Sequence, residues 1–360
     1  MSNPTILTLD AGGTNFVFNA IKDDLRVADP VRLPSCGDDL DRCLEQIFAG
    51  FDEVLASLLE APKAISFAFP GPADYANGVI GNLNNLPAFR GGVPLGALLE
   101  ERYKLPVYIN NDADLFVAGE AEKGLLHEIN TQLEQAGQKK RYKNLIGITL
   151  GTGFGVGVSL NGNLLNGDNG LGAEGWLMRN KLLPKANMEE TLSIRAVKRV
   201  FAEQLSISID DTPEPDEIYR MIINRDELFA APALECYLRF GEALGDVIAN
   251  LVTLFDGIVV IGGGLSGAWE VFSGIMFGEL RTAFTLQNGD RLHRLVQKVY
   301  NWEDEEQRAA FLQPGIRIIT TQNGTEVPYQ EVNRIAVGLS KLGTSEAVEI
   351  GAYRVGLANL

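Results

Sequence analysis

Apolar residues recur along this chain with two periods, one typical of helices and one typical of strands. Segments with apolar residues at helical spacing are expected to form helices with one buried face, and they lie at 40–59, 240–255 and 347–358. Short apolar runs bounded by turn-forming residues predict buried strands, and they lie at 65–69, 106–109 and 258–261. Helices and strands that alternate in this way predict an α/β protein.

Two further apolar runs end in Gly-rich turns that resemble each other. Thr5–Leu9 leads into Asp10-Ala11-Gly12-Gly13-Thr14-Asn15, and Leu145–Leu150 leads into Gly151-Thr152-Gly153. After each turn the chain resumes as an apolar strand, which predicts two hairpins. Glycines lack a Cβ, so their backbone N–H groups can approach a phosphate closely. Either stretch could be an ordinary hairpin turn, but the repetition favours two similar domains that bind one nucleotide.

The charge and composition exclude several classes of protein. The chain has 360 residues and a formal net charge of −16, which disfavours nucleic acid or an anionic membrane as a partner. It is long enough for two domains. The first residues lack the basic and apolar regions of a signal peptide, and no apolar run has the roughly 20 residues of a membrane span. We therefore expect a soluble cytoplasmic protein.

The order of the motifs resembles that of the ROK family, whose catalytic members are sugar kinases of the actin-like ATPase superfamily. The two Gly-rich turns are similar to the family's phosphate motifs, and Ile261-Gly262-Gly263-Gly264 is similar to its adenosine motif. The remaining motifs correspond to sugar-side loops, a catalytic pair and a closing helix, and they are Pro70-Gly71-Pro72, Asn85-Leu86-Pro87, Asn111-Asp112 and Ile350-Gly351-Ala352. The resemblance covers nearly the whole chain.

This resemblance implies an α/β fold of two actin-like (ribonuclease H-like) domains, with a nucleotide and sugar cleft between them. We expect one domain at 1–117 plus the C-terminal helix 341–360, and the other at 118–340. Closure over the substrates is expected, because water must be kept from taking the phosphate.

The resemblance also assigns roles to individual residues. ATP is expected to contact Asp10, Gly12, Gly13, Thr14, Asn15, Gly151, Thr152, Gly153, Gly262 and Gly263. The sugar is expected to contact Gly71, Asn85, Asn111, Asp112, Glu174 and Glu189. Asp10 would hold Mg²⁺, through water.

Asp112 is the candidate general base. A hydroxyl that attacks a γ-phosphate needs a fixed position and an acceptor for its proton, and a carboxylate at a strand end can supply both. The same carboxylate could instead cap the following helix. Glu189 has two alternatives as well, since it could be a solvated residue at a helix start, and Glu190 offers a competing register.

The chain departs from the family pattern at one position. Many relatives have a histidine three residues after the acid that corresponds to Glu174, followed by a cysteine-rich zinc loop, whereas here Leu177 stands at that position. Residues 176–187 contain neither Cys nor His, so no zinc is expected. Without a metal, the loop is expected to be anchored by the packing of its apolar side chains, which are Trp176, Leu177, Met178, Leu182 and Leu183.

The sequence therefore predicts an ATP-dependent hexose kinase, with glucose as the leading acceptor. N-acetylglucosamine, N-acetylmannosamine, mannose and fructose are alternatives, as are a phosphoryl donor other than ATP and a non-catalytic sugar sensor. A DNA-binding regulator is disfavoured, because the first phosphate motif begins at residue 10 and the chain is acidic. A homodimer is left open. Segments 125–144 and 281–315 are expected to be insertions, the first a solvated helix and loop, and the second without an assigned role.

Overall fold

The computed structural model describes residues 3–12, 14–71, 73–81 and 86–360. The chain forms two compact units. The first comprises 1–124, 157–173 and 341–360, and the second comprises 125–156 and 174–340. Gly13 and Asn85, both predicted to contact a substrate, lie outside the described residues.

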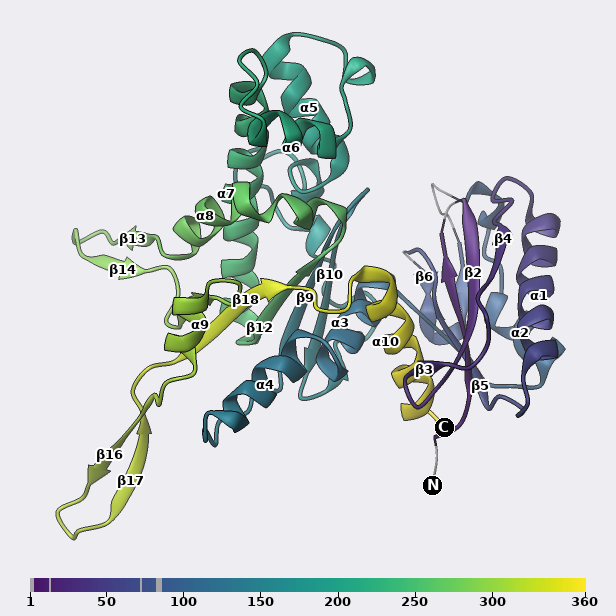
Figure 1. Cartoon of the computed structure of the whole chain (residues 1–360), viewed down its shortest axis with the longest axis horizontal. Helices are drawn as coiled ribbons and strands as arrows, with labels where there is room; N and C mark the ends of the chain where they lie inside the picture. Colours follow the sequence, from purple (N-terminus) through teal and green to yellow (C-terminus); the bar gives the residue numbers. More distant parts are fainter. Residues whose placement is uncertain (1–2, 13, 72, 82–85) are drawn as a thin grey trace. The chain divides into compact units, whose positions relative to one another are not determined.

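The sheet of the first unit is built on the predicted N-terminal hairpin (Figure 1). Its strand order is β3-β2-β1-β5-β8, and β4 also pairs with β2. β1 is antiparallel to β2 but parallel to β5, which is in turn parallel to β8. The bounds are β1 Ile6–Ala11, β2 Asn15–Lys22, β3 Leu25–Arg26, β4 Val31–Pro34, β5 Ala64–Ala68 and β8 Val107–Asn110. A small hairpin, β6 Ala73–Asp74 with β7 Val79–Ile80, follows β5.

Helices cover both faces of this sheet. Figure 1 shows α1 (Leu40–Ser57) and α2 (Leu95–Tyr103) on one face, and α10 (Thr344–Ala358) on the other. The predicted helices at 40–59 and 347–358 are confirmed. Asp39 caps α1 by accepting the Arg42 N–H, and the apolar stripe of α1 packs on a core rich in phenyl rings, with those of Phe18 and Phe51 5.0 Å apart.

Helix α3 (Asp112–Glu122) packs against α10 with almost no space between the backbones. A Cβ on Gly351 would lie 1.9 Å from the Leu115 carbonyl oxygen, and a Cβ on Gly119 would lie 2.0 Å from that of Ala347. The fully buried Glu120 of α3 accepts the N–H groups of Lys341 and Leu342, just before α10. Glycine at two crossing points and one buried carboxylate therefore fix α3 on α10.

The sheet of the second unit repeats the arrangement of the first. Strands β10-β9-β12-β18-β15 are neighbours in that order, and β9, β12, β18 and β15 are parallel. The bounds are β9 Leu145–Leu150, β10 Phe154–Leu160, β12 Ile258–Gly262, β15 Lys298–Asn301 and β18 Arg334–Leu339. Residues 157–160 of β10 and the short β11 (Asn163–Leu164) belong to the first unit.

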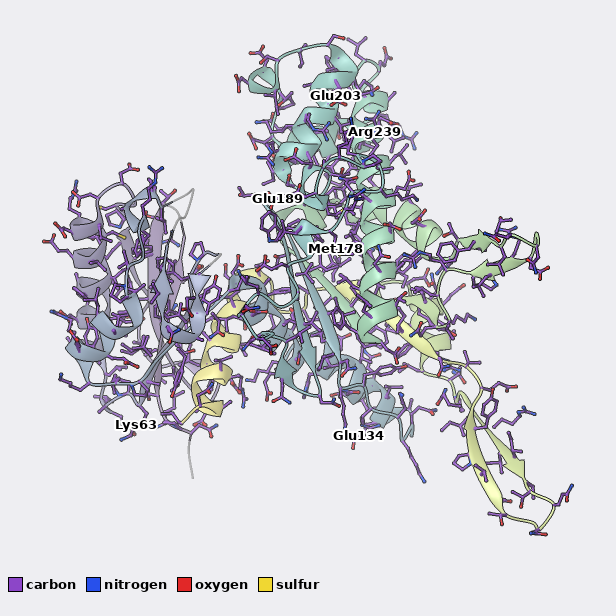
Figure 2. All side chains as sticks on the ribbon, turned by 180° about the vertical axis from the view of Figure 1, so that it is seen from behind. Lys63, Glu134, Met178, Glu189, Glu203 and Arg239 are labelled. Carbon is purple, nitrogen blue, oxygen red and sulfur yellow. The ribbon has the colours of Figure 1, made fainter. Side chains whose placement is uncertain are left out.

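The second unit carries most of the helices. They are α4 Leu125–Gln135, α5 Ile194–Leu205, α6 Pro215–Ile223, α7 Ala230–Phe255, α8 Trp269–Leu280 and α9 Glu305–Phe311. The predicted helix at 240–255 is the second half of α7. Glu203 of α5 and Arg239 of α7, labelled in Figure 2, form an ion pair at 3.5 Å. No helix in the described part of the chain is both long and apolar enough to cross a bilayer.

The two expected insertions differ from the prediction. In 125–144, α4 buries Leu125, Ile129 and Leu133, so this helix is solvated on one face only. In 281–315, β15 is the edge strand of the main sheet, and Trp302 is fully buried with its indole N–H bonded to Glu128. The segment also holds β13 (Ala283–Thr285) and β14 (Arg291–His293), which pair only with each other. Part of the second segment therefore belongs to the core of its unit.

The glycine contact between α3 and α10 generates a stability prediction. In an open helix interior, Gly→Ala stabilises by about 0.5–1 kcal/mol, but the new methyl of Gly351→Ala would overlap the Leu115 carbonyl. We expect Gly351→Ala to lower the free energy of unfolding by about 1–3 kcal/mol, measured by urea unfolding. The matched control is Gly274→Ala in α8, where the added methyl meets no atom within 4 Å. Equal effects of the two substitutions would contradict the predicted contact.

Candidate functional site

The predicted site residues of the first unit lie at the carboxyl ends of the strands of its sheet. In the parallel register, Asp10 of β1 pairs with Ala68 of β5, and Ala68 pairs with Asn110 of β8. Adjacent strands lie about 4.8 Å apart, so the ends of β1 and β8 are about 10 Å apart in the sheet. Asn111 and Asp112 follow β8 directly. Asp10 and Asp112 therefore extend from the carboxyl ends of strands, where ligands bind in open α/β sheets.

Asp112 is the first residue of α3, but it is not the N-cap residue. Asn111 occupies the N-cap position and accepts the Ala113 N–H at 2.8 Å through its side chain. The Asp112 carboxylate also accepts this N–H, at 2.8 Å, and the residue is exposed. The positive end of the helix dipole favours a negative charge there. Since Asn111 already caps the helix, capping alone does not explain a carboxylate at 112.

Gly71 lies beside Asn111, with Tyr75 completing this cluster. The Tyr75 hydroxyl donates to the Phe69 carbonyl at 3.0 Å, and Asn111 Nδ2 donates to the Tyr75 hydroxyl at 3.3 Å. A Cβ on Gly71 would lie 2.4 Å from that hydroxyl. Sequence reasoning missed Tyr75, because nothing in its local pattern distinguishes it from an ordinary loop tyrosine. Its hydroxyl orients the Asn111 side chain and requires glycine at 71.

The first Gly-rich turn is closed by its own backbone. The Gly12 N–H donates to the Asn15 carbonyl at 3.1 Å, and a Cβ on Gly12 would lie 2.9 Å from that oxygen. The Thr14 carbonyl accepts the Ser35 N–H at 3.0 Å, which ties the turn to the end of β4. Thr14 itself is exposed. In this conformation the Gly12 N–H is used inside the turn and not directed at a ligand.

A small cavity of about 230 Å³ lies beside Asp10. Thr8 and Asn19 line it, and their Oγ1 and Oδ1 atoms are buried without a hydrogen-bond partner in the described structure. Arg32 of β4 also lines the cavity. Val17 of β2 lies between the two charged residues, because it pairs with Asp10 on one side and with Arg32 on the other. Asp10 is exposed to solvent, but desolvation of its carboxyl by the surrounding protein raises its pKa, and the positive charge of Arg32 acts in the opposite direction. The cavity thus combines a perturbed carboxylate with two unsatisfied oxygens.

The second Gly-rich turn is braced by Glu189. The Gly151 N–H donates to the Gly153 carbonyl at 3.0 Å, and the Phe154 N–H donates to Glu189 Oε2 at 3.2 Å. A Cβ on Gly153 would lie 2.7 Å from the same carboxylate oxygen, and Thr152 at the tip is exposed. Figure 2 shows Glu189 where the sheet meets the helical part of the unit.

The neighbouring Glu190 is engaged elsewhere. Its carboxylate pairs with Arg195 of α5 on the surface of the unit. Glu189, and not Glu190, therefore bonds to the backbone of the glycine turn.

Glu174 precedes the short 3₁₀ helix Gly175–Leu177, and the Trp176 indole N–H donates to its carboxylate. The prediction of apolar anchors is wrong for Leu177 and Leu183, whose exposed fractions are 58% and 37%. Asn180 holds the loop instead, because it is almost fully buried and bonds to Thr191 at 2.6 Å and to three backbone groups. A side chain that satisfies this many buried backbone groups can replace apolar packing.

Gly262 and Gly263 end β12. Gly263 has a φ of +89°, and a Cβ there would lie 2.3 Å from the Leu150 carbonyl oxygen. The strand-to-helix turn into the 3₁₀ helix Gly264–Ala268 therefore needs glycine for its own geometry. This turn and Gly151 follow the carboxyl ends of neighbouring strands, because β9 and β12 are parallel and Gly262 lies opposite Thr149.

The predicted residues therefore form two sets. Asp10, Gly71, Asn111 and Asp112 lie at one sheet edge of the first unit, and Gly151, Gly153, Glu189 and Gly263 lie at one sheet edge of the second. Within the described ranges, no group of three or more His, Cys, Asp or Glu residues has the arrangement of a metal site.

Comparisons with known proteins give the family. The model of the ROK family matches residues 6–277. A crystal structure of a glucokinase from Parabacteroides distasonis superposes with a TM-score of 0.89 and 45% sequence identity, covering 99% of this chain and 98% of that one. The glucokinase of Thermotoga maritima is 27% identical over 77% of this chain and 86% of its own length. The N-acetyl-D-glucosamine kinase of Photobacterium profundum is 27% identical over 71% and 83%.

The predicted actin-like fold is confirmed by the structural match, and the repeated hairpin-first sheets are its two halves. The family model spans most of the chain and includes the glycine turns and Asn111-Asp112. This chain belongs to the ROK family.

Proposed function

We propose that this sugar kinase transfers the γ-phosphoryl group of ATP to glucose, giving glucose 6-phosphate, with Asp112 as the general base. The single observation that carries the role of Asp112 is its position beside an N-cap that Asn111 already provides. The similarity to two glucokinases, one of them 45% identical, supports glucose as the acceptor.

Asp112 suits the role of base for electrostatic reasons. Its carboxylate is exposed at the start of α3 and accepts the Ala113 N–H, so the side chain is fixed in place where a sugar hydroxyl can reach it. The carboxylate would orient the hydroxyl and accept its proton as the oxygen attacks the γ-phosphorus. Asn111, held by Tyr75, would bind a second hydroxyl, since buried sugar hydroxyls need partners. Gly71 would leave room for the ring.

For the remaining sugar contacts we propose Glu174, Glu189 and Asn85. Glu174 and Glu189 are carboxylates, which can accept hydrogen bonds from sugar hydroxyls. Leu177, 58% exposed, offers no hydrogen bond at the position where many relatives have histidine. A pocket without that bond discriminates weakly between sugars that differ at one hydroxyl.

For the nucleotide, we propose that the two Gly-rich turns hold the phosphates and that Gly262 and Gly263 border the adenosine. The contributing residues of the turns are Gly12, Gly13, Thr14, Asn15, Gly151, Thr152 and Gly153. The Gly12 and Gly151 N–H groups are bonded within their turns, whereas Thr14 and Thr152 are exposed, so their hydroxyls can donate to the phosphates. Asn15 closes the first turn through its carbonyl.

The oxygens near Asp10 fit a hydrated Mg²⁺. Mg²⁺ keeps most of its waters and is held by one or two carboxylates together with substrate phosphates. Asp10 supplies the carboxylate, and the unpartnered Thr8 Oγ1 and Asn19 Oδ1 can accept hydrogen bonds from such waters. When bound, the ion would neutralise charge on the phosphates.

N-acetyl-D-glucosamine is the second candidate acceptor, because a kinase for that sugar is 27% identical to this chain. Coupled measurement of ADP release would compare kcat/KM for glucose, mannose, fructose, N-acetylglucosamine and N-acetylmannosamine. We expect glucose to give the highest value. A higher value for N-acetylglucosamine would replace glucose as the acceptor and leave the reaction class intact.

Asp112→Asn tests the general base. Asparagine keeps the size of the side chain but cannot take a proton, so we expect kcat to fall by about 10²–10⁴, with little change in the KM for ATP. The control is Asp41→Asn, which removes an exposed acid from the first turn of α1. A folded Asp112→Asn protein with near-normal turnover would contradict the proposal.

Glu189→Ala tests the brace of the second turn. Loss of the hydrogen bond to the Phe154 N–H, worth about 1 kcal/mol, should raise the KM for ATP roughly five-fold. Glu190→Ala is the matched control, since both glutamates pair with Arg195 but only Glu189 bonds to the turn. A rise confined to the KM for the sugar would show that Glu189 acts through the sugar and not through the turn.

Arg32→Gln tests the Asp10 cavity through pH. Desolvation raises the Asp10 pKa, so the ionised form is lost at a higher pH than for an ordinary aspartate. Removing the positive charge of Arg32 should raise this pKa further. The pH below which protonation of Asp10 abolishes metal binding should therefore be higher in the variant. Electron paramagnetic resonance measures the fraction of Mn²⁺ bound in the presence of ADP at each pH. Arg42→Gln on α1 is the control. An unchanged midpoint pH would remove Asp10 from the metal site.

A further inference from the structure

One segment of the second unit lies outside both sets of site residues and outside the core. Strands β16 (Ile316–Thr320) and β17 (Glu326–Gln330) pair only with each other, and Figure 1 shows this hairpin extending away from the rest of its unit. All five residues of β16 are exposed. We call residues 316–330 the arm.

The arm is apolar on both faces. Directly paired residues of an antiparallel ladder share a face, and Ile318 pairs with Pro328 while Ile319 pairs with Val327. One face therefore carries Ile318 and Pro328, and the other carries Ile319 and Val327. The exposed fractions of Ile318, Ile319 and Val327 are 53%, 43% and 46%. Neither face can be the solvent face of an ordinary amphipathic hairpin.

The base of the arm is firmly attached. Arg334 Nη1 donates to the Phe311 carbonyl, and Gln330 Nε2 donates to the carbonyls of Gly315 and Val332. The Glu331 N–H also donates to the Gly315 carbonyl. A two-stranded hairpin is marginally stable in water, so these bonds hold the arm at its root but leave its strands without a covering layer.

The two outer edges of the arm are not equivalent. Proline lacks an N–H and is tolerated in strands where its nitrogen faces away from the partner strand. Pro328 therefore removes a donor from the outer edge of β17. The outer edge of β16 has no proline, and its sequence Ile-Arg-Ile-Ile-Thr is rich in β-branched residues. An exposed edge of this kind is a template for another strand.

The charge of the arm identifies the strand that can pair with it. Arg317 and Glu326 are its only charged residues, so its net charge is zero on a chain of −16. Two copies of this acidic chain repel each other elsewhere, and the arm is a neutral, apolar place for them to meet. An antiparallel pair of identical strands is also self-complementary about a two-fold axis.

We propose that the arm joins two copies of this chain, with β16 pairing antiparallel to β16 of a second copy in a four-stranded sheet. An axis at Ile318 places Arg317 opposite Ile319 of the partner subunit, so no like charges face each other. Ile318 lies opposite Ile318 of the partner subunit. The pairing provides partners for the free edge of β16 and brings the apolar faces of the two arms side by side.

The test uses this self-pairing position. Wild-type protein should be dimeric in analytical ultracentrifugation, whereas Ile318→Lys and Ile318→Glu each place like charges across the axis. Such a juxtaposition costs several kcal/mol, so the dissociation constant should rise at least about a hundredfold for each variant. An equimolar mixture of the two variants should dimerise again, since lysine then faces glutamate.

Ile223→Lys is the matched control, because Ile223 on α6 has a similar exposed fraction of 50% and lies outside the arm. It should remain dimeric. Turnover of the Ile318 variants should stay at the wild-type level, which shows that they are folded. A monomeric wild type, a dimeric Ile318→Lys protein or a mixture that stays monomeric would overturn the proposal.

Discussion

The crossing of α3 and α10 is the contact on which the position of Asp112 in the first unit depends. The two helices approach backbone to backbone because one of them lacks a Cβ at each close contact: Gly351 lies against the Leu115 carbonyl, and Gly119 lies against the Ala347 carbonyl. The same helix α3 begins with Asp112, and Gly157 of β10 packs against the Ala113 carbonyl, where a Cβ would lie 2.2 Å away. Close contacts at glycines therefore hold α3 in place at its first turn and further along the helix.

Buried polar side chains complete what the glycines allow. Glu120 holds the chain that enters α10, Asn180 holds the loop after Glu174, and Glu189 holds the second Gly-rich turn. Each accepts backbone N–H groups that would otherwise be buried without a partner, which is costly. In the loop 176–187, the buried amide of Asn180 bonds to the backbone of Leu182 and of Asn187.

The sequence predicted the parts of the fold that depend on local patterns. The helices, the strand ends and the two glycine hairpins follow from periodicity and turn chemistry, and the ROK resemblance brought them into one order. Asn180 and Tyr75 could not be predicted in this way, because their importance comes from hydrogen bonds to residues that only the folded chain brings near. The same holds for Leu177 and Leu183, since apolar side chains in an irregular loop have no period that says which of them are buried.

The two halves of the fold repeat one sheet but close their glycine turns differently. Each turn contains a backbone hydrogen bond, from Gly12 to Asn15 in the first unit and from Gly151 to Gly153 in the second. The first turn is tied to β4 through the Ser35 N–H, whereas the second is bonded to a carboxylate at its Phe154 N–H. A turn braced by Glu189 is coupled to the segment that leads into α5, because the Ile194 N–H donates to the Gly151 carbonyl at 2.9 Å and Ser193 bonds to the Glu189 carbonyl. A movement of that segment therefore changes the shape of the second turn, because the segment and the turn share these hydrogen bonds.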